Sequence, residues 1–386
     1  MSEIERIISN TRAYSCLDCG KCTVACPVAQ YDPSFSPRKL VYNTINSNGS
    51  EPYSDNQIWS CITCARCEAR CQSGVRYAEL IQSLRTEAHS IGETGECTHG
   101  GALQSLMHIM TADNLNQNRL DWVDKSLKTA TEADVLYFVG CNPYFDIIFS
   151  DLGVKTKATA KGAVKLLNRL GIVPALMPNE RCCGHDLLWA GDKEHFLRLA
   201  EHNIREICKT GAKQVVTSCP EGYQTLKFEY PRYLGNMDFE VIHISQLLAE
   251  AVADNRLKFR RTNKKVTYHD PCRLGRFAGI YDEPRSILSA IPGLDLIEMP
   301  RNRVNALCCG TQAWMNCGTV NKQIQAERLR EAAATGAEIL LTSCPKCQIH
   351  LQCALHDGKL AEELGIEIED ITSLAAKALS NQEVLE

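Results

Sequence analysis

The chain has 386 residues, a formal net charge of −4, 44% hydrophobic residues and 23% charged residues, proportions that are typical of globular domains. Its length predicts two or three domains. Neither the charge nor the 6% of aromatic residues favours nucleic acid or an anionic membrane as a partner. Cysteine is the exception to this ordinary composition, because the chain contains 21 of them.

The first ten residues are polar and do not resemble a secretory signal. The longest apolar runs have the length of strands, far below the roughly 20 residues that a membrane helix needs. We therefore expect a cytoplasmic protein with no transmembrane segment. Because the cytosol keeps thiols reduced, metal ligation explains the cysteines better than disulfides do. This interpretation also predicts oxygen sensitivity and an anaerobic or microaerobic setting.

Two cysteine runs in the first 95 residues share the spacing C-x2-C-x2-C-x3-C. They are Cys16, Cys19, Cys22 and Cys26, followed by Cys61, Cys64, Cys67 and Cys71. This spacing is typical of ferredoxins that hold [4Fe–4S] clusters. Residues 37–45, which begin with proline, and residues 77–89, with apolar positions at helical spacing, predict helices. We expect a mainly helical two-cluster ferredoxin domain over residues 1–95.

In two-cluster ferredoxins the fourth cysteine of a run ligates the other cluster. One cubane is then assigned to Cys16, Cys19, Cys22 and Cys71, and the other to Cys61, Cys64, Cys67 and Cys26. The second run ends in Gln72, whereas the first ends in Pro27. Structural zinc is the alternative, but it favours paired C-x2-C elements over runs of four.

Residues 96–133 are polar and helical in character, with a break at 114–118, and we expect a linker that packs against its neighbours. From residue 134 onward, strand and helix patterns alternate, which predicts α/β architecture with largely parallel sheets. The expected strands are residues 135–139, 173–177, 214–217, 239–244, 266–269, 294–299, 339–342 and 366–368. The expected helices are residues 157–170, 194–209, 321–334 and 372–379.

The second part of the chain is an internal repeat. Segments that begin at Arg205 and Arg330 match with an offset of 125 residues, and the two Cys-Cys-Gly (CCG) tripeptides differ by 126. Two related α/β units are therefore expected, at residues 134–258 and 259–386, with cysteines at strand ends, where such sheets place their sites. The first unit carries Cys141, Cys182, Cys183 and Cys219, and the second carries Cys272, Cys308, Cys309, Cys344 and Cys347. Gly222 stands at the position that matches Cys347.

The C…CCG…CPxC pattern of the second unit resembles the cysteine-rich CCG domain of heterodisulfide reductases and related iron–sulfur oxidoreductases. The order of domains resembles the catalytic subunit of the membrane-type heterodisulfide reductase, equivalent to fused C and B subunits. The resemblance implies a noncubane [4Fe–4S] cluster at the five cysteines of the second unit, which would be the catalytic ones. In that family such a cluster binds a substrate thiolate and splits a disulfide in two one-electron steps.

The first CCG unit departs from the family pattern at Gly222. Its four thiolates are enough for a further [4Fe–4S] cluster, which would relay electrons or offer an open iron site, but the five-ligand noncubane form is in doubt. A purely structural lobe is the alternative. The chemistry is therefore expected in the second unit.

The resemblance implies an iron–sulfur oxidoreductase subunit in which electrons pass from two cubane clusters to the CCG clusters, where a disulfide or related acceptor is reduced. The chain has neither a dinucleotide-binding fingerprint nor a P-loop, so a flavin-containing, A-subunit-like partner or another electron-donor subunit is expected, in a hetero-oligomeric complex. The alternative is a pure electron-transfer subunit of a flavin-based bifurcating complex that feeds another reductase, such as a class II aryl-CoA reductase. A quinone-linked dehydrogenase subunit of the glycolate oxidase type is a third interpretation.

Several residues near the motifs invite a functional or a structural interpretation. Cys97, Cys208, Cys317 and Cys353 lie outside the motifs, and free cysteine commonly behaves as a small buried hydrophobe. His185 follows the first CCG and could supply a proton, or could simply hydrogen-bond its surroundings. Asp270 is expected to shape the loop before Cys272, and Gly184 and Gly310 to let the backbone approach the clusters.

Overall fold

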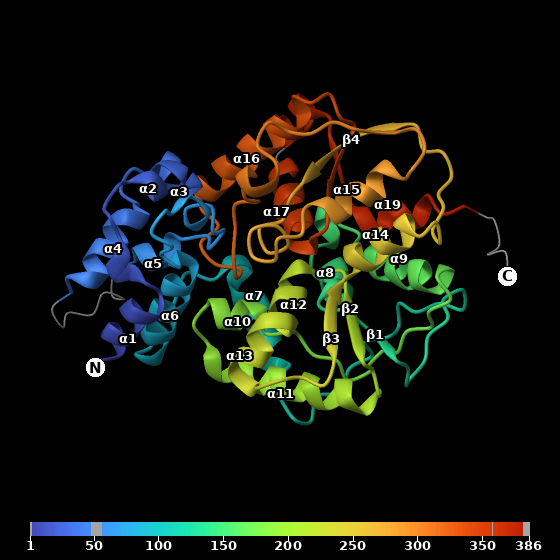
Figure 1. The fold of residues 1–386 in the computed structure, drawn as a ribbon, viewed down its shortest axis with the longest axis horizontal. Helices are drawn as coiled ribbons and strands as arrows, with labels where there is room; N and C mark the ends of the chain where they lie inside the picture. Colours follow the sequence, from blue (N-terminus) through green and yellow to red (C-terminus); the bar gives the residue numbers. More distant parts are fainter. Residues whose placement is uncertain (1, 48–55, 357, 381–386) are drawn as a thin grey trace.

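A helical segment with no strand in its described part comes first in the fold. The computed structural model describes residues 2–47, 56–356 and 358–380. Figure 1 shows this N-terminal segment, coloured blue, at one side of two α/β units. Its helices are α1 (Glu3–Asn10), α2 (Lys21–Ala25), α3 (Pro27–Tyr31), α4 (Pro37–Ile45), α5 (Gln57–Ser60) and α6 (Tyr77–Ser90), with short 3-10 turns at Ala13–Ser15 and Glu68–Arg70.

The two predicted helices of this segment are confirmed. Helix α4 begins where the sequence predicts, because the Ser36 hydroxyl accepts from the amide of Lys39 and Pro37 occupies the first turn. Helix α6 buries one apolar face, which includes Leu80, Ile81 and Leu84. The same helix buries Arg85, whose guanidinium donates to carbonyl groups from several parts of the chain.

The expectation of a helical linker over residues 96–133 is only partly correct. The structure has a 3-10 turn at Thr98–Gly101 and helix α7 (Ala102–Ile109), and no helix over residues 110–133. Asparagine and aspartate are frequent in that stretch, and their side chains compete with helical hydrogen bonding. The segment is instead attached by a buried ion pair, in which Arg119 lies 2.5 Å from Glu180.

The first α/β unit contains a parallel sheet in the order β1-β2-β3. Its strands are β1 (Val135–Phe138), β2 (Gln214–Thr217) and β3 (Glu240–His243). The predicted strand at residues 173–177 is wrong, because only isolated bridges join Ala175 to Ala130 and Leu136. Pro174 cannot donate to a ladder, which limits this edge of the sheet. The helices of the unit are α8 (Asn142–Ile148), α9 (Thr156–Arg169), α10 (His185–Trp189), α11 (Lys193–Lys209), α12 (Pro220–Gln224), α13 (Tyr230–Leu234) and α14 (Ile244–Ala253).

The second unit contains a parallel sheet in the order β5-β4-β6-β7. Its strands are β4 (Lys264–His269), β5 (Leu294–Leu296), β6 (Ile339–Thr342) and β7 (Glu367–Asp370). Strand β5 ends three residues earlier than predicted. The helices are α15 (Asp282–Ser289), α16 (Thr319–Ala333), α17 (Pro345–Leu355), α18 (Gly358–Leu364) and α19 (Ile371–Lys377).

The internal repeat is visible in equivalent hydrogen bonds as well as in equivalent strands. The Tyr137 hydroxyl lies 2.8 Å from the Ser218 hydroxyl, and the matching pair, Tyr268 and Ser343, lies 2.9 Å apart. Helix α9 of the first unit packs against α19 of the second (Figure 1). Residues of both units belong to one buried apolar cluster. No helix among the described residues has the length and apolarity to cross a bilayer.

Candidate iron–sulfur centres

The thiol of Cys26, from the first run, lies with the cysteines of the second run. Burial raises the pKa of Cys26, and the thiols of Cys64 and Cys61 raise it further. Burial likewise raises the pKa of Cys67, with contributions from Cys64, Cys61 and Cys26. All four of these cysteines line one small cavity, so their side chains converge on one place.

The other four cysteines of the N-terminal segment lie nearer to solvent. Cys16, Cys22 and Cys71 are half-buried, and Cys19 is exposed. The 3-10 turn that precedes Cys71 packs against α2, which carries Cys22. Burial raises the pKa of Cys22, and the Cys16 thiol adds to that rise. This side of the segment is the more accessible of the two.

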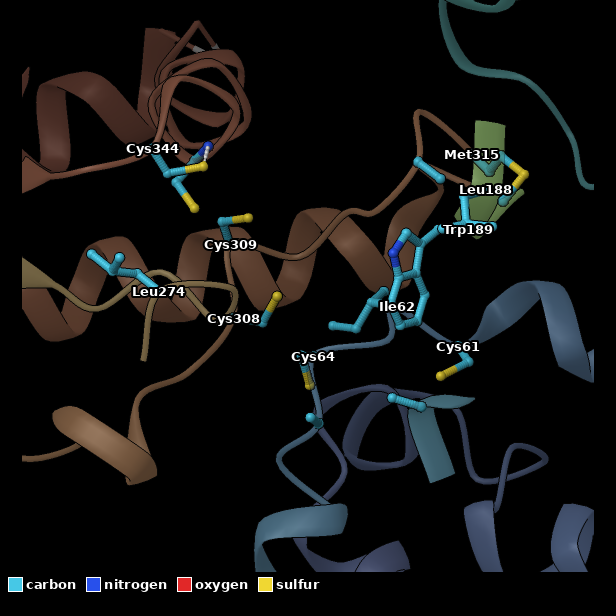
Figure 2. Packing of buried hydrophobic residues seen from close by; sticks show 14 of the residues in the cluster. Cys61, Ile62, Cys64, Leu188, Trp189, Leu274, Cys308, Cys309, Met315 and Cys344 are labelled. Atoms are coloured by element: carbon cyan, nitrogen blue, oxygen red, sulfur yellow. Dashed lines mark hydrogen bonds between the residues drawn. The ribbon is translucent and has the colours of Figure 1, made fainter. Parts of the chain in front are cut away.

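The second cysteine run meets the second CCG unit directly. Figure 2 shows the Cys64 thiol beside Cys308, with Cys309 and Cys344 beyond it. A hydrogen bond from the Cys308 thiol lowers the pKa of Cys64. Arg276 strengthens this junction, since its Nε donates to the Cys64 carbonyl at 2.6 Å and its Nη1 donates to the Ala306 carbonyl at 2.9 Å.

The five cysteines of the second unit form one connected group at the carboxyl ends of β4 and β6. Hydrogen bonding to Cys272 and Cys309 raises the pKa of the Cys308 thiol, and hydrogen bonding to Cys309 and Cys344 raises the pKa of the Cys347 thiol. Cys272 is half-buried, and the other four thiols are at most 5% exposed. Cys344 caps helix α17 by accepting from the amide of Cys347 at 3.4 Å.

The first unit brings its four cysteines together in the same way. Hydrogen bonding to Cys141 and to Cys183 lowers the pKa of the Cys182 thiol. Hydrogen bonding to Cys182, burial and the nearby Cys219 thiol raise the pKa of Cys183. Cys219 caps α12 through the amide of Gly222 at 3.5 Å, the counterpart of the Cys344 cap. Gly222 lies in helix α12, as Cys347 lies in helix α17. The first unit therefore has the backbone position of the fifth cysteine but no thiol there.

The two CCG sites adjoin each other through a buried ionic cluster, which we define as Lys346, Asp186, Glu221 and His185. The Lys346 ammonium lies 2.5 Å from Asp186 and 3.0 Å from Glu221, and His185 Nε2 lies 3.6 Å from Glu221. Burial would lower the pKa of Lys346, but the two carboxylates outweigh it and raise that pKa. Next to this cluster, the thiols of Cys219 and Cys344 are near enough to interact.

The buried ionic cluster was not predicted, although the repeat contained a signal for it. Glu221 and Lys346 occupy matching positions, in CPEG and CPKC, and carry opposite charges. They form a pair because the two units face each other at these loops. Arg273 belongs to the same region, since it lies 3.9 Å over the Trp189 ring and donates to the Thr63 hydroxyl at 2.9 Å.

The histidines near the motifs are buried, and burial disfavours their charged forms. Burial lowers the pKa of His185 well below its ordinary value, and the positive charges of Arg273 and Lys346 lower it further. Burial and, to a smaller extent, the positive charge of Arg328 lower the pKa of His269 to about 3. Asp270 accepts from Arg285 at 2.7 Å and from the amide of Arg303 at 2.8 Å, so it fixes the loops around Cys272.

Gly184 and Gly310 both occupy backbone positions that require glycine. Both have left-handed backbone, with φ of +82° and +90°, and both press against a helix. A Cβ at Gly184 would lie 2.8 Å from the Phe196 ring, and one at Gly310 would lie 2.9 Å from the Asn321 carbonyl. Glycine therefore lets each CCG loop turn tightly against α11 or α16.

The four remaining cysteines are not the buried hydrophobes that the sequence suggested. Cys97 and Cys208 are exposed, and Cys317 and Cys353 are half-buried. Three of them, Cys97, Cys317 and Cys353, line a cavity of about 450 Å³ together with Lys322 and His350. The same cavity reaches Thr311, two residues after Cys309, so it adjoins the second CCG site.

The thiol groups fit iron–sulfur clusters in number and in chemistry. Burial raises the pKa of Cys219 and of Cys344, so these thiols need a positive partner to become the thiolates that ligate metals. Backbone amides also point at the sulfurs, with Thr63 donating to Cys61 at 3.3 Å and Gly184 donating to Cys182 at 3.4 Å. Such hydrogen bonds are usual around cluster sulfurs.

Replacing Gly222 with cysteine is expected to give the first unit a fifth ligand. The position is helical, and a Cβ there would meet only Thr217 and Cys219, at 3.5 and 3.6 Å, which are ordinary contacts. Electron paramagnetic resonance (EPR) spectra of the anaerobic protein should therefore change toward the form of the second unit. Gly222→Ser is the matched control, and equal spectra for the two variants would contradict the expectation.

Comparison with known proteins identifies both kinds of domain. The family described as a cysteine-rich domain, CCG, matches residues 135–227 and 266–352, and a 4Fe-4S dicluster domain family matches residues 12–75. The D subunit of the dihydromethanophenazine:CoB–CoM heterodisulfide reductase of Methanosarcina mazei is 31% identical over 95% of this chain and 93% of its own length.

Two further matches are more distant. The EtfAB:quinone oxidoreductase of Syntrophomonas wolfei is 28% identical over 89% of this chain, which corresponds to 48% of that protein. The crystal structure of a hypothetical protein from Helicobacter pylori matches the fold with a TM-score of 0.57 at 9% identity, covering 99% of this chain and 72% of that one.

Proposed function

Since the chain belongs to the heterodisulfide reductase family of iron–sulfur oxidoreductases, we propose that it passes electrons from two cubane clusters to CCG-bound clusters that reduce a disulfide or a related acceptor. In this proposal Cys16, Cys19, Cys22 and Cys71 hold one cubane, and Cys61, Cys64, Cys67 and Cys26 hold the other. The five cysteines of the second unit hold a noncubane [4Fe–4S] cluster, and the four of the first unit hold a further cluster.

One observation carries the proposal: the cysteine groups adjoin one another in a series. Cys64 lies beside Cys308 in Figure 2, and the Cys219 and Cys344 thiols are near enough to interact, which supports the order second cubane site, second CCG site, first CCG site. The clusters would supply one-electron redox chemistry and a place for a thiolate to bind. In this series the first CCG site lies farther from the ferredoxin segment than the second does.

The side chains around the second CCG site have positioning roles in this proposal. Arg276 holds the Cys64 loop against the loop before Cys308, and Arg273 ties the ferredoxin segment to the same region through Thr63. These cations also favour the thiolate forms of the neighbouring cysteines. A hydrogen bond from Cys308 lowers the pKa of Cys272 most, burial opposes it, and Arg273 and Arg276 lower the pKa further. An acceptor could approach through the cavity that Lys322 and His350 line.

The partner in this proposal is a subunit that donates electrons, and a flavin protein is the class that fits best. Cys19 is exposed and Cys16 is half-buried, which supports a first cubane site that a donor can reach. A donor that docks there could deliver electrons without entering the α/β units. We accordingly propose a hetero-oligomeric complex.

A second candidate function is electron transfer without a substrate of its own. Burial of Cys308, Cys309, Cys344 and Cys347 favours it, because their thiols have little direct contact with solvent. In that case the chain would serve a bifurcating complex and pass electrons onward to another reductase.

The test uses anaerobically purified protein with full iron content and reduced viologen as the donor. We expect disulfide reduction by the unsubstituted chain and by Cys208→Ala, which removes an exposed thiol outside the motifs. Cys347→Ala should abolish it while the two cubane EPR signals persist. If all clusters accept electrons and no disulfide is reduced, the electron-transfer function replaces the reductase proposal.

A further inference from the structure

Three histidines converge on one carboxylate at the junction of three parts of the chain, outside all the cysteine motifs. Asp192 Oδ2 lies 2.7 Å from His108 Nε2 and 4.0 Å from His89 Nε2, and Asp192 Oδ1 lies 2.9 Å from His195 Nδ1. His89 lies in the last turn of α6, His108 belongs to α7, and Asp192 and His195 lie at the start of α11. We call these four residues the histidine–aspartate cluster.

The backbone holds Asp192 firmly in this place. Its side chain caps α11 by accepting from the amide of His195 at 3.2 Å. Gly191, with φ of +94°, lies so close to α6 that a Cβ there would be 2.2 Å from the Arg85 carbonyl oxygen and 3.1 Å from the His89 side chain. The Arg85 guanidinium in turn donates to the Trp189 carbonyl at 3.0 Å. The loop of Asp192 is therefore fixed against the helix that carries His89.

The side chains are arranged with the carboxylate inside and the imidazoles outside. The Asp192 side chain is 5% exposed, while those of His89, His108 and His195 are 36%, 46% and 30% exposed. Burial would raise the pKa of Asp192, but hydrogen bonds to His195 and His108 outweigh it and lower that pKa. A cation could thus reach an ionised carboxylate from solvent, with imidazoles already around it.

We propose that the histidine–aspartate cluster binds Zn²⁺ through His89, His108, His195 and Asp192. Imidazole nitrogen and carboxylate oxygen are zinc ligands, and a site with four protein ligands is of the structural kind. Ligand atoms of His108, Asp192 and His195 already lie within 4.8 Å of one another. Around an ion at 2.0–2.1 Å, tetrahedral ligand atoms lie about 3.3 Å apart, so the three contacts between Asp192 and the histidines each need to change by less than about 1 Å.

The bound ion would join α6 of the ferredoxin segment, α7 of the linker and α11 of the first CCG unit. A purely hydrogen-bonded cluster would hold the same groups without metal. The two cases differ in whether Zn²⁺ binds with saturation and in which atoms surround it. Zinc held by cluster cysteines would show sulfur at about 2.3 Å, whereas this site would show only nitrogen and oxygen at about 2.0–2.1 Å.

The test adds Zn²⁺ to the anaerobic protein after its iron content has been measured. We expect one saturable equivalent by equilibrium dialysis, and an X-ray absorption spectrum at the zinc edge with a nitrogen and oxygen shell alone. His108→Gln and His89→Gln, both at exposed positions, should each weaken binding more than about tenfold, because losing even a hydrogen-bond partner of a metal ligand costs about 10–100-fold. Their iron content should stay unchanged.

His202→Gln is the matched control, because His202 lies on α11 and pairs with the Asn179 carbonyl outside the cluster. It should bind zinc as the unsubstituted chain does. Sulfur in the zinc shell, no saturable binding, or equal affinity in His108→Gln would each overturn the proposal.

Discussion

Replacing Cys26 with alanine is expected to eliminate the cluster of the second cysteine run and leave the cluster of its own run in place. The reason is the crossed arrangement, in which the Cys26 thiol lies with Cys61, Cys64 and Cys67. Iron per chain should fall by about four atoms, the content of one [4Fe–4S] cluster. Electron transfer to the second CCG site should fall with it, since Cys64 is the residue that contacts Cys308.

Two reference variants make this result unambiguous. Cys64→Ala defines the EPR spectrum that remains without the second cubane, and Cys19→Ala defines the one that remains without the first. The spectrum of Cys26→Ala should coincide with that of Cys64→Ala, and the spectrum of Cys71→Ala with that of Cys19→Ala. The opposite pairing would mean that each run builds its own cluster.

Replacing Lys346 with methionine is expected to destabilise the folded chain by about 3–5 kcal/mol, the range for breaking a buried ion pair from one side. The Lys346 side chain is 3% exposed and lies between Asp186 and Glu221, so its loss leaves two buried carboxylates without a counter-charge. The urea midpoint under anaerobic conditions should fall accordingly, with iron content measured in parallel to separate unfolding from cluster loss.

Two further variants test the cause of that destabilisation. Glu221→Gln in the Lys346→Met background removes one of the stranded charges and should recover part of the stability. Lys264→Met breaks an exposed pair with Glu338, in which the lysine side chain is 46% exposed, and should change stability by less than about 1 kcal/mol. Equal effects at Lys346 and Lys264 would show that burial of the ion cluster is unimportant.

Patterns in the local sequence correctly predicted several helices and strands. The helix at Pro37–Ile45 and the strands at Gln214–Thr217 and Ile339–Thr342 lie where proline, capping and apolar runs placed them. The strand expected at residues 173–177 is not formed. Apolar periodicity predicted it, but periodicity takes no account of the backbone N–H that proline at position 174 lacks.

In the candidate site, too, only the features that depend on local sequence were predicted. Motif spacing identified the cysteine groups, because ligand spacing is a local property. The pairing of Lys346 with Glu221 depends on how two units face each other, and the gathering of Cys97, Cys317 and Cys353 at one cavity depends on three distant segments. Neither follows from composition or periodicity, although the opposite charges at matching repeat positions hinted at the first.

The contact between Cys64 and Cys308 has a consequence for how the protein behaves on dilution. Both residues belong to one chain, so their meeting is an intramolecular event. A covalent connection of this kind replaces a bimolecular equilibrium with an effective concentration on the order of millimolar. Two separate polypeptides would need comparable abundance to keep the same junction populated, whereas this chain maintains a one-to-one ratio of its halves at any level of expression.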